Sequence, residues 1–202
     1  MEPTICKTPT IYDTGAGVGG DEYIEIEGTI YKVVKINGQE WLNKNLCYIN
    51  RAWSPSGSST TEPRATIYRA SIDSGIKTAV ALSSGVLYNP IAARWIINNI
   101  DLKGFRLPTS QEIRDLYTTD NRSKLKTSYC WTNPGTDEFN FNLPAYGIYT
   151  GSSFNNYGSN ATIWSDGVSN TPAEFNYLND SGVEVSGDTT NSSYCGIRLI
   201  RG

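Results

Sequence analysis

Alternating apolar and polar residues predict antiparallel strands near the start of the chain. Between Glu22 and Leu46 the sequence reads EYIEIEGTIYKVVKINGQEWLNKNL, in which Tyr, Ile and Val recur on both sides of Gly28. The Asn37-Gly38 pair is a strong signal for a two-residue hairpin turn, and the residues EWL supply the returning strand. We therefore expect an antiparallel sheet in this region.

Two later segments carry the spacing and the end signals of short helices. In LYNPIAARWIINNI, Asn89 can cap a helix that has Pro90 at its first position, and apolar residues follow at helical spacing. In GFRLPTSQEIRDLY, Thr109 and Glu112 form a Thr-x-x-Glu capping box. The residues that this second helix is expected to bury are Ile113, Leu116 and Tyr117.

Beyond Lys126 the chain consists of short apolar pulses separated by Gly, Asn, Ser and Asp. Phe139, Phe141 and Leu143 alternate with two asparagines, which is the period-two pattern of a strand with one wet face. We expect several short strands with long polar loops in this half. The predicted fold class is therefore α+β, with two short helices, antiparallel sheets and long irregular loops.

Low-complexity stretches divide the chain into an arm and one domain. Residues 1–20 contain the run GAGVGG and little apolar sequence, which is typical of an arm or linker, and we place the N-terminal arm or attachment segment at residues 1–28. Residues 29–202 are expected to form a single domain, which suits a length of 202 residues. Within this domain, residues 48–86 contain SPSGSSTTEP and are predicted to be a loop-rich insertion.

The absence of histidine narrows the possible chemistry. The chain lacks the commonest general base and zinc ligand, and it cannot form a Ser-His or Cys-His catalytic pair. Its four cysteines, at positions 6, 47, 130 and 195, form no CxxC pair, which argues against a zinc knuckle or a thioredoxin-like site. We expect them to be small buried residues, with one or two disulfides as the alternative.

Charge is unevenly distributed along a chain whose formal net charge is -3. Residues 127–197 contain no Lys or Arg. The acids in that segment are Asp137, Glu138, Asp166, Glu174, Asp180, Glu184 and Asp188. Such a surface would repel phosphate, so nucleic acid is not an expected partner. No apolar run is long enough to predict insertion in a membrane, and the start MEPTICKTPT lacks the apolar core of a signal peptide.

Six motifs give the chain a resemblance to a known family. In order they are VVKINGQEWLNKNL (33–46), LYNPIAARW (87–95), GFRLPTSQEIRDL (104–116), FNLPAYGIY (141–149), IWSDG (163–167) and CGIRLIRG (195–202). Together they resemble the Fibrobacter succinogenes major paralogous domain family of the C-type lectin-like superfamily, from roughly residue 29 to the C-terminus. The resemblance implies a C-type lectin-like fold whose N- and C-terminal strands pair, with two helices outside and a second, loop-rich sheet presenting the ligand surface.

The chain departs from the family pattern at positions that bear on disulfides and calcium. The family commonly has Trp-Ser-Ser where this chain has Trp164-Ser165-Asp166, and it often has a cysteine inside the final strand, whereas Cys195 precedes that strand here. Both departures put a family disulfide in doubt. The sequences EPR (62–64) and WTN (131–133) match calcium-binding lectin motifs only in part, and Arg64 would bring a positive charge to the cation. We predict no metal site.

The sequence argues against two enzyme classes. Formylglycine-generating enzymes of the same superfamily activate oxygen with paired cysteines, and Cys130 and Cys195 lack that local spacing. A carboxylate pair for glycoside hydrolysis is not indicated by the spacing of the acids. We therefore predict that the protein is not an enzyme, with no catalytic residues and no cofactor.

The chain also resembles the variable receptor-binding proteins that phages and bacteria diversify by retroelements. Those systems mutate adenines, so asparagine codons change readily to codons for Tyr, Asp, Ser, Thr or Ile, although Asn, Ser and Asp are also ordinary turn formers. This set is frequent between residues 154 and 194. The predicted ligand-binding residues are Asn155, Asn156, Tyr157, Asn160, Asp166, Asn170, Asn176, Tyr177, Asn179, Asp180, Asn191, Ser193 and Tyr194.

Other side chains are assigned to the frame rather than to the ligand. The tryptophans Trp41, Trp95, Trp131 and Trp164 lie in family motifs or apolar runs and are expected in the core. Arg106 is expected to fix its loop by bonding backbone carbonyls or an acid such as Asp115. The three tyrosines of the predicted site offer stiff rings for a ligand, with packing in the core as the alternative.

These observations predict a non-enzymatic binding and adhesion module. We expect the receptor-binding tip of a phage or bacterial surface assembly, located on a virion or a cell surface, which recognises a host-surface glycan or protein through the loops of residues 150–194. Residues 1–28 would join it to a larger fibre or virion assembly. The alternative from another class is a structural component of a virion or fibre, and an enzyme, either an oxidase like the formylglycine-generating enzymes or a glycosidase, comes after it.

Overall fold

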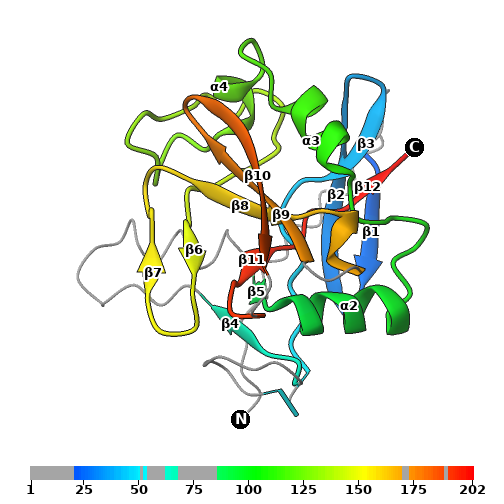
Figure 1. Ribbon diagram of the computed structural model, residues 1–202. Coiled ribbons are helices and arrows are strands. Elements are labelled where there is room, and N and C mark those ends of the chain that lie inside the picture. Colours follow the sequence, from blue (N-terminus) through cyan, green and yellow to red (C-terminus); the bar gives the residue numbers. More distant parts are fainter. Residues whose placement is uncertain (1–20, 51, 54–61, 68–85, 170–172, 189–190) are drawn as a thin grey trace.

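Two β-sheets form the framework of the protein, whose described residues make an α+β structure with few helices (Figure 1). The computed structural model describes residues 21–50, 52–53, 62–67, 86–169, 173–188 and 191–202. In this part of the chain a four-stranded sheet has the order β1-β2-β3-β12, and a six-stranded sheet has the order β10-β9-β8-β11-β5-β4. The pairings are antiparallel except that of β8 with β11, which is parallel. The predicted α+β class is confirmed.

The four-stranded sheet joins the two ends of the described chain. Its strands are β1 (Tyr23–Ile26), β2 (Thr29–Ile36), β3 (Gln39–Leu42) and β12 (Ile200–Arg201). Asn37 and Gly38 have φ values of 53° and 81°, so the predicted hairpin turn forms where the sequence signal lies. Ile200 pairs with Trp41, which places the C-terminal strand beside the N-terminal hairpin. Because β1 pairs with β2, residues 23–26 form a strand of this sheet and are not part of the predicted arm over residues 1–28, whose first twenty residues lie outside the described residues.

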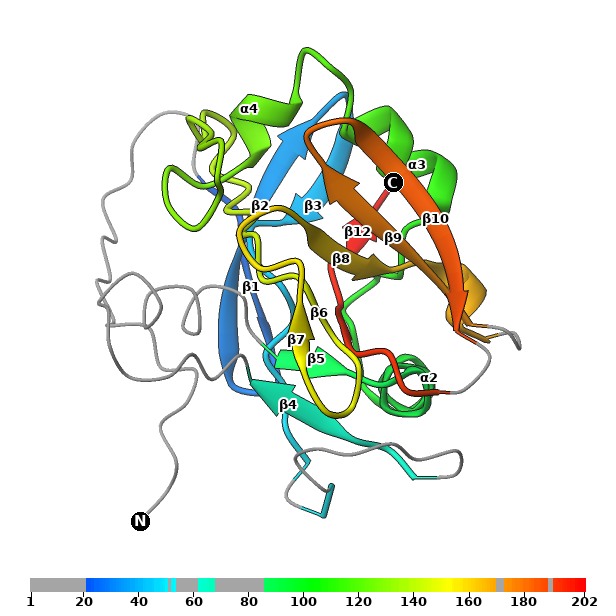
Figure 2. The same cartoon turned by 60° about the vertical axis from the view of Figure 1, so that its left-hand side comes forward.

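The six-stranded sheet is built mainly from the second half of the chain. Its strands are β4 (Ala65–Ile67), β5 (Val86–Tyr88), β8 (Ala161–Trp164), β9 (Ala173–Asn179), β10 (Gly182–Asp188) and β11 (Cys195–Gly196). Strands β9 and β10 form the longest hairpin, and Figure 2 shows them side by side at one edge of the sheet, with α2 below. A separate hairpin is formed by β6 (Ile148–Tyr149) and β7 (Phe154–Asn155). Of the predicted insertion at 48–86, residues 65–67 form a strand and most of the rest lies outside the described residues.

Both predicted helices form with the predicted caps. They are α2 (Pro90–Asn99) and α3 (Ser110–Leu116), and two shorter helical turns follow, α4 (Arg122–Leu125) and the 3-10 turn η1 (Asp166–Ser169). The Asn89 side chain accepts from the Ala92 N–H at 2.9 Å. The Thr109 side chain accepts from the Glu112 N–H at 3.0 Å, and the Glu112 carboxylate accepts from the Thr109 N–H at 2.8 Å.

Arg106 ties the loop before α3 to the helix itself. Its guanidinium donates to both carboxylate oxygens of Glu112, at 2.8 and 2.6 Å, and to the Leu107 carbonyl at 3.0 Å. The predicted bond to a backbone carbonyl is confirmed, whereas the suggested partner Asp115 is wrong. Asp115 instead accepts from Gln111 one helical turn earlier. Glu112 is nearer because it already points back to the N-terminus of the helix in the capping box.

The core is divided between two clusters of buried residues, one on each face of the β8-β9-β10 part of the large sheet. Trp164 and Phe175 belong to the cluster that includes the buried residues of α2. Ile163 and Leu178 belong to the cluster that includes the buried residues of α3. Trp41, Trp131 and Trp164 are buried, as predicted. Trp95 is only partly buried and packs against the rings of Tyr48 and Trp53.

Residues 139–143 do not form the predicted strand. Asn140 and Asn142 both have φ of 53°, in the left-handed region, so the chain turns where extended residues were expected. The carbonyls exposed by this irregular path are bound by the fully buried Arg198, which donates to those of Phe141 and Asn142 at 2.5 and 3.3 Å. The strand prediction is wrong because a partner distant in sequence satisfies the backbone.

Of the cysteines in the described residues, one is in a disulfide bond and two are free thiols. Cys47 is disulfide-bonded, which follows the alternative weighed from the sequence. Cys195 is a buried free thiol, as expected, and Cys130 is free and partly buried. Burial raises the pKa of Cys130 to about 12 and that of Cys195 well above its ordinary value. Neither free thiol is therefore poised as a thiolate.

Candidate ligand-binding surface

The β6-β7 hairpin presents polar side chains on a frame that is fixed from within. The Tyr149 ring packs against Phe154 with centroids 4.7 Å apart and against Tyr194 with centroids 5.1 Å apart. Its hydroxyl donates to the Gly151 carbonyl at 2.7 Å, which holds the turn of the hairpin. Asn155 lies at the end of β7 with its side chain exposed, within 3.4 Å of the hydroxyls of Thr150 and Ser153.

The turn after β7 continues this frame. Asn156 is exposed and has φ of 60°, and its carbonyl accepts from the Asn160 N–H at 3.1 Å. The Asn160 carbonyl in turn accepts from the Gly147 N–H at 2.7 Å, while Tyr157 is partly buried against the core. A side chain at Gly147 would place Cβ 2.0 Å from the Asn155 carbonyl, so this position closes the hairpin only as glycine. Asn155 and Asn156 therefore stand on an ordered turn.

Strands β9 and β10 bring a second set of predicted residues next to that hairpin. Tyr177 lies between Thr162 of β8 and Glu184 of β10 in the strand register, so all three side chains share one face of the sheet. The Thr162 hydroxyl donates to the Gly147 carbonyl at 2.7 Å. This bond joins the face that carries Tyr177 to the base of the β6-β7 hairpin. Tyr177 is partly exposed and Glu184 is exposed.

The turn between β9 and β10 is held by Asn179 and Asp180, which the sequence analysis assigned to ligand binding. The Asn179 side chain accepts from the N–H groups of Ser181 and Gly182, at 2.8 and 3.0 Å. Asp180 forms an ion pair with Lys126 at 2.6 Å and accepts from Asn133 at 2.5 Å. A lysine from outside residues 127–197 therefore neutralises one of the acids in that segment. Asn179 and Asp180 both stabilise the turn.

Several predicted contact residues lie apart from these two elements or beneath the surface. Asp166 is exposed at the start of η1, and Asn191 accepts from Arg94 of α2 at 3.4 Å. The Ser193 N–H donates to the Asp188 carboxylate at 2.6 Å. Asn170 lies outside the described residues. The structure therefore does not bring all thirteen predicted residues together.

Asn176 and Tyr194 are fully buried, each with 0% of its surface exposed. Tyr194 packs against Tyr149, and burial raises the pKa of its hydroxyl to about 12. The prediction that these two residues meet an external ligand is corrected, because a buried side chain cannot reach one without a conformational change. The Asn176 amide also lacks a hydrogen-bond partner for either polar atom among the described residues.

Glu184 is a surface residue of this face that the predicted site omitted. The sequence signal was present, because Asn179–Gly182 reads NDSG, a turn sequence between two apolar-alternating runs. A hairpin that turns at these four residues pairs Glu184 with Tyr177. Glutamate is not one of the asparagine-related residue types on which the predicted site is based.

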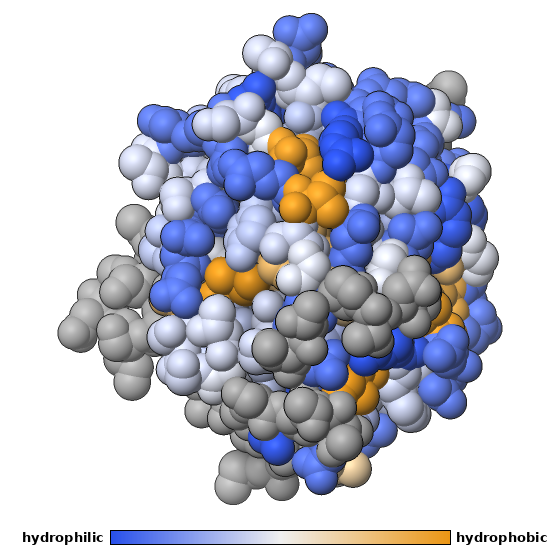
Figure 3. Space-filling model, viewed as in Figure 1, coloured by the Kyte–Doolittle hydropathy of each residue, from blue (hydrophilic) through white to orange (hydrophobic). Residues whose placement is uncertain are grey.

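The described residues show no group of three or more His, Cys, Asp or Glu side chains that could hold a metal ion. In the same part of the chain no helix is long and apolar enough to cross a membrane. Figure 3 shows the face that contains β9 and β10 to be largely hydrophilic, with small separate hydrophobic patches. Its exposed groups suit hydrogen bonding and ring contacts with a ligand.

Comparison of the chain with protein-family models, curated proteins and solved structures finds no match.

Proposed function

We propose that the protein is a non-enzymatic ligand-binding and adhesion module that recognises a host-surface glycan or protein. We name its ligand surface the hairpin surface and define it as residues 148–160 together with the exposed side chains of Tyr177 and Glu184. The observation that carries the proposal is that Asn155 and Asn156 are exposed on a turn fixed by buried contacts. Amide groups that donate and accept suit sugar hydroxyls and peptide groups alike, and a rigid turn loses little entropy on binding.

We further propose a C-type lectin-like fold. Its support is the pairing of the C-terminal strand with the N-terminal hairpin, the two principal helices α2 and α3, and the second sheet with long connections. A receptor-binding tip of a phage or bacterial surface assembly, diversified by a retroelement, would follow from this resemblance. A reverse-transcriptase gene beside a near-copy of the DNA for residues 150–194 would test the diversification.

A structural role in a virion or fibre is the second candidate, and one surface favours it. Tyr23 and Ile30 are 58% and 42% exposed, and they share a face of β1-β2 because Tyr23 is paired with Lys32 and Ile30 with Glu25. Exposed apolar groups of this kind suit a contact between subunits. Mass measurement in solution separates the two roles, since a structural component predicts obligate assembly.

The test of ligand binding uses a glycan array and an envelope extract from bacteria. The double variant Asn155→Ala/Asn156→Gly removes two amides while glycine keeps the positive φ of position 156. We expect about tenfold weaker binding, as for contact residues at the centre of an interface. Asn98→Ala, at an exposed position of α2, is the matched control.

Circular dichroism of both variants checks that the fold is kept. Unchanged binding by the double variant would remove the hairpin from the site. Absence of binding to every glycan and every extract would reject the proposed function.

A further inference from the structure

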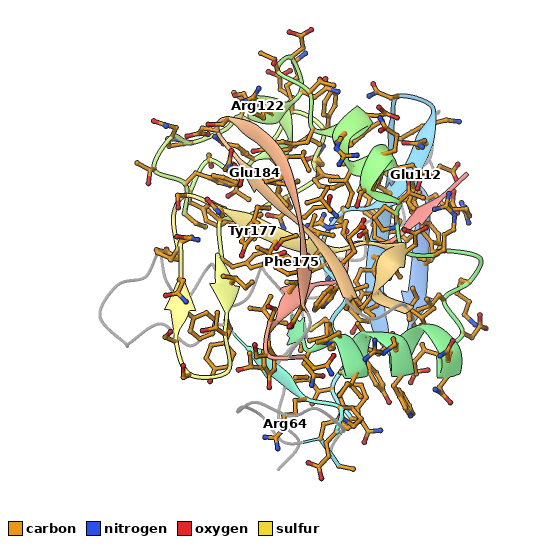
Figure 4. The ribbon with its side chains drawn as sticks, in the orientation of Figure 1. Arg64, Glu112, Arg122, Phe175, Tyr177 and Glu184 are labelled. Atoms are coloured by element: carbon orange, nitrogen blue, oxygen red, sulfur yellow. The ribbon has the colours of Figure 1, made fainter. Side chains whose placement is uncertain are left out.

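An aromatic ring and a carboxylate stand side by side on one face of β9 and β10, near the turn that joins the two strands. Tyr177 and Glu184 are directly paired in the antiparallel register, so their Cβ atoms are about 5 Å apart on the same face. Figure 4 labels both side chains near the centre of the view, with Phe175 beside Tyr177. A ring face next to a carboxylate is a combination that attracts cations, through the ring quadrupole and through direct charge.

The Tyr177 ring is held in place by the ring of Phe175 beside it, which in turn packs against Trp164. Its centroid is 5.1 Å from that of Phe175 at an interplanar angle of 70°, and Phe175 lies 5.5 Å from Trp164 at 81°. Phe175 and Trp164 are buried at 2% and 0% exposure, whereas Tyr177 is partly exposed. Edge-to-face packing on a buried support fixes the orientation of the outermost ring. The exposed part of Tyr177 is therefore a preorganised contact surface.

The Glu184 carboxylate has capacity to bind a cation. Among the described residues it takes part in no ion pair, and it accepts one hydrogen bond, from Asn179 Nδ2 at 3.3 Å. The basic groups at the β9-β10 turn are engaged with Asp180, since Lys126 pairs with its carboxylate and Arg122 donates to its carbonyl.

The face around the ring carries negative charge. Asp188 follows Glu184 at a spacing of four along β10 and therefore lies on the same face, and it is buried at 4% exposure. Burial is the largest cause that raises the pKa of Tyr177, and the negative charges of Glu184 and Asp188 raise it further. The same negative potential that opposes a tyrosinate favours an external cation.

We propose that Tyr177 and Glu184 bind a lysine or arginine side chain of a surface protein. This inference rests on the proposed function and names the chemistry of its ligand. The methylene stem of such a side chain lies along the Tyr177 ring while its cationic end pairs with Glu184. The negative charges of Glu184 and Asp188 supply the complementarity.

An amino sugar is the other source of a cation, and the surroundings favour it less. Its hydroxyls need several free polar partners around the ammonium group. Here the Asn179 oxygen already accepts from two backbone N–H groups, and the Thr162 hydroxyl donates to the Gly147 carbonyl. A protein side chain with an apolar stem needs fewer such partners.

The test titrates the protein with a ten-residue Lys-Ser peptide and, separately, with a chitosan oligosaccharide, following backbone amide shifts by NMR. We expect the peptide to shift the amides of β9 and β10, with about fivefold weaker binding in Glu184→Gln, as for an exposed ion pair, and in Tyr177→Leu. Tyr177→Phe keeps the ring and should bind nearly as the parent does. Glu138→Gln removes an exposed acid elsewhere and is the charge control.

The outcomes separate this inference from the proposed function. Peptide binding that is equal in the parent and in Glu184→Gln would overturn the inference, even where a glycan or envelope ligand still depends on Asn155. Binding of chitosan without binding of the peptide would overturn the choice of a protein partner. Loss of shifts in Glu184→Gln, with Glu138→Gln unchanged, supports it.

Discussion

The guanidinium of Arg198 lies over the ring of Phe141, with Cζ 4.3 Å from the ring centroid. It also donates to the Phe141 carbonyl, to the Leu42 carbonyl at 3.1 Å and to Asn45 Oδ1 at 2.9 Å. Arg198 is completely buried, and burial lowers its pKa to about 10, so the side chain remains charged near pH 7. A single buried cation thus joins the last motif of the sequence to the first sheet and to the irregular segment 139–143.

We expect Arg198→Met to lower the free energy of unfolding by about 3–5 kcal/mol or to prevent folding. The methionine leaves several buried carbonyl and amide oxygens without donors, and each such group is costly. Denaturant unfolding measures the change. Arg114→Met, on the exposed side of α3, is the control and should alter stability by about 0.5 kcal/mol or less. Equal effects of the two substitutions would contradict the role assigned to Arg198.

Arg106 and the backbone of Thr109 stabilise the ionised form of Glu112 at the start of α3. The hydrogen bond from Arg106 is the largest cause that lowers the pKa of Glu112 to about 2. Because the folded pKa is below the unfolded value, this stability is present above pH ~4.5 and is lost as pH falls toward 2.

Glu112→Gln should therefore cost about 1–2 kcal/mol near pH 6, after allowance for solvent around the partly exposed Arg106. Unfolding free energies of parent and variant, measured between pH 2 and pH 7, should converge at the acid end. A difference that stays constant over this range would show that the ionised carboxylate is not the cause.

The elements that were predictable from the sequence depend on signals within a few residues. Asn37-Gly38 forms its turn and Asn89 caps α2, because each bond is made inside the local segment. The path of residues 139–143 depends instead on Arg198, which is more than fifty positions away. Alternation of Phe and Asn could not reveal that distant donor.

The sequence predicted the residue types of the candidate site better than it predicted which of their side chains are exposed. Asn155 and Asn156 lie on an exposed turn, as their residue types suggest. In β9, however, both faces are packed, so the strand's burial pattern gives no clear inside and outside. Local sequence could therefore not tell that Asn176 is buried while its neighbour Tyr177 is partly exposed.

Two buried asparagines differ in how well their amides are satisfied. Asn45 accepts from Arg198 Nε, whereas neither polar atom of Asn176 has a partner among the described residues. We expect Asn176→Leu to raise the free energy of unfolding by about 1 kcal/mol, because an unpaired amide is costly to bury and leucine has a similar volume. Asn45→Leu should instead destabilise the protein by about 2–3 kcal/mol. Chemical denaturation compares them, and destabilisation by both would refute the distinction.

Gly147 and Gly28 provide a matched test of the frame that presents the hairpin surface. Their φ values are nearly equal, at 71° and 75°, but an added Cβ meets the Asn155 carbonyl at 2.0 Å at Gly147 and nothing within 4 Å at Gly28. Both alanine variants carry the cost of a left-handed residue, about 1 kcal/mol. Gly147→Ala must in addition displace the backbone next to Asn155, so we expect it to cost about 2–3 kcal/mol in total.

Thermal unfolding and amide hydrogen exchange measure the two effects. Gly147→Ala should speed hydrogen exchange at the backbone N–H groups of residues 147 and 160. It should also weaken the binding of ligand to the hairpin surface. Gly28→Ala should leave both unchanged, because its turn lies in the other sheet between β1 and β2. Equal losses of stability, with hydrogen exchange in the 147–160 turn unaffected, would mean that close packing at Gly147 does not hold the hairpin in place.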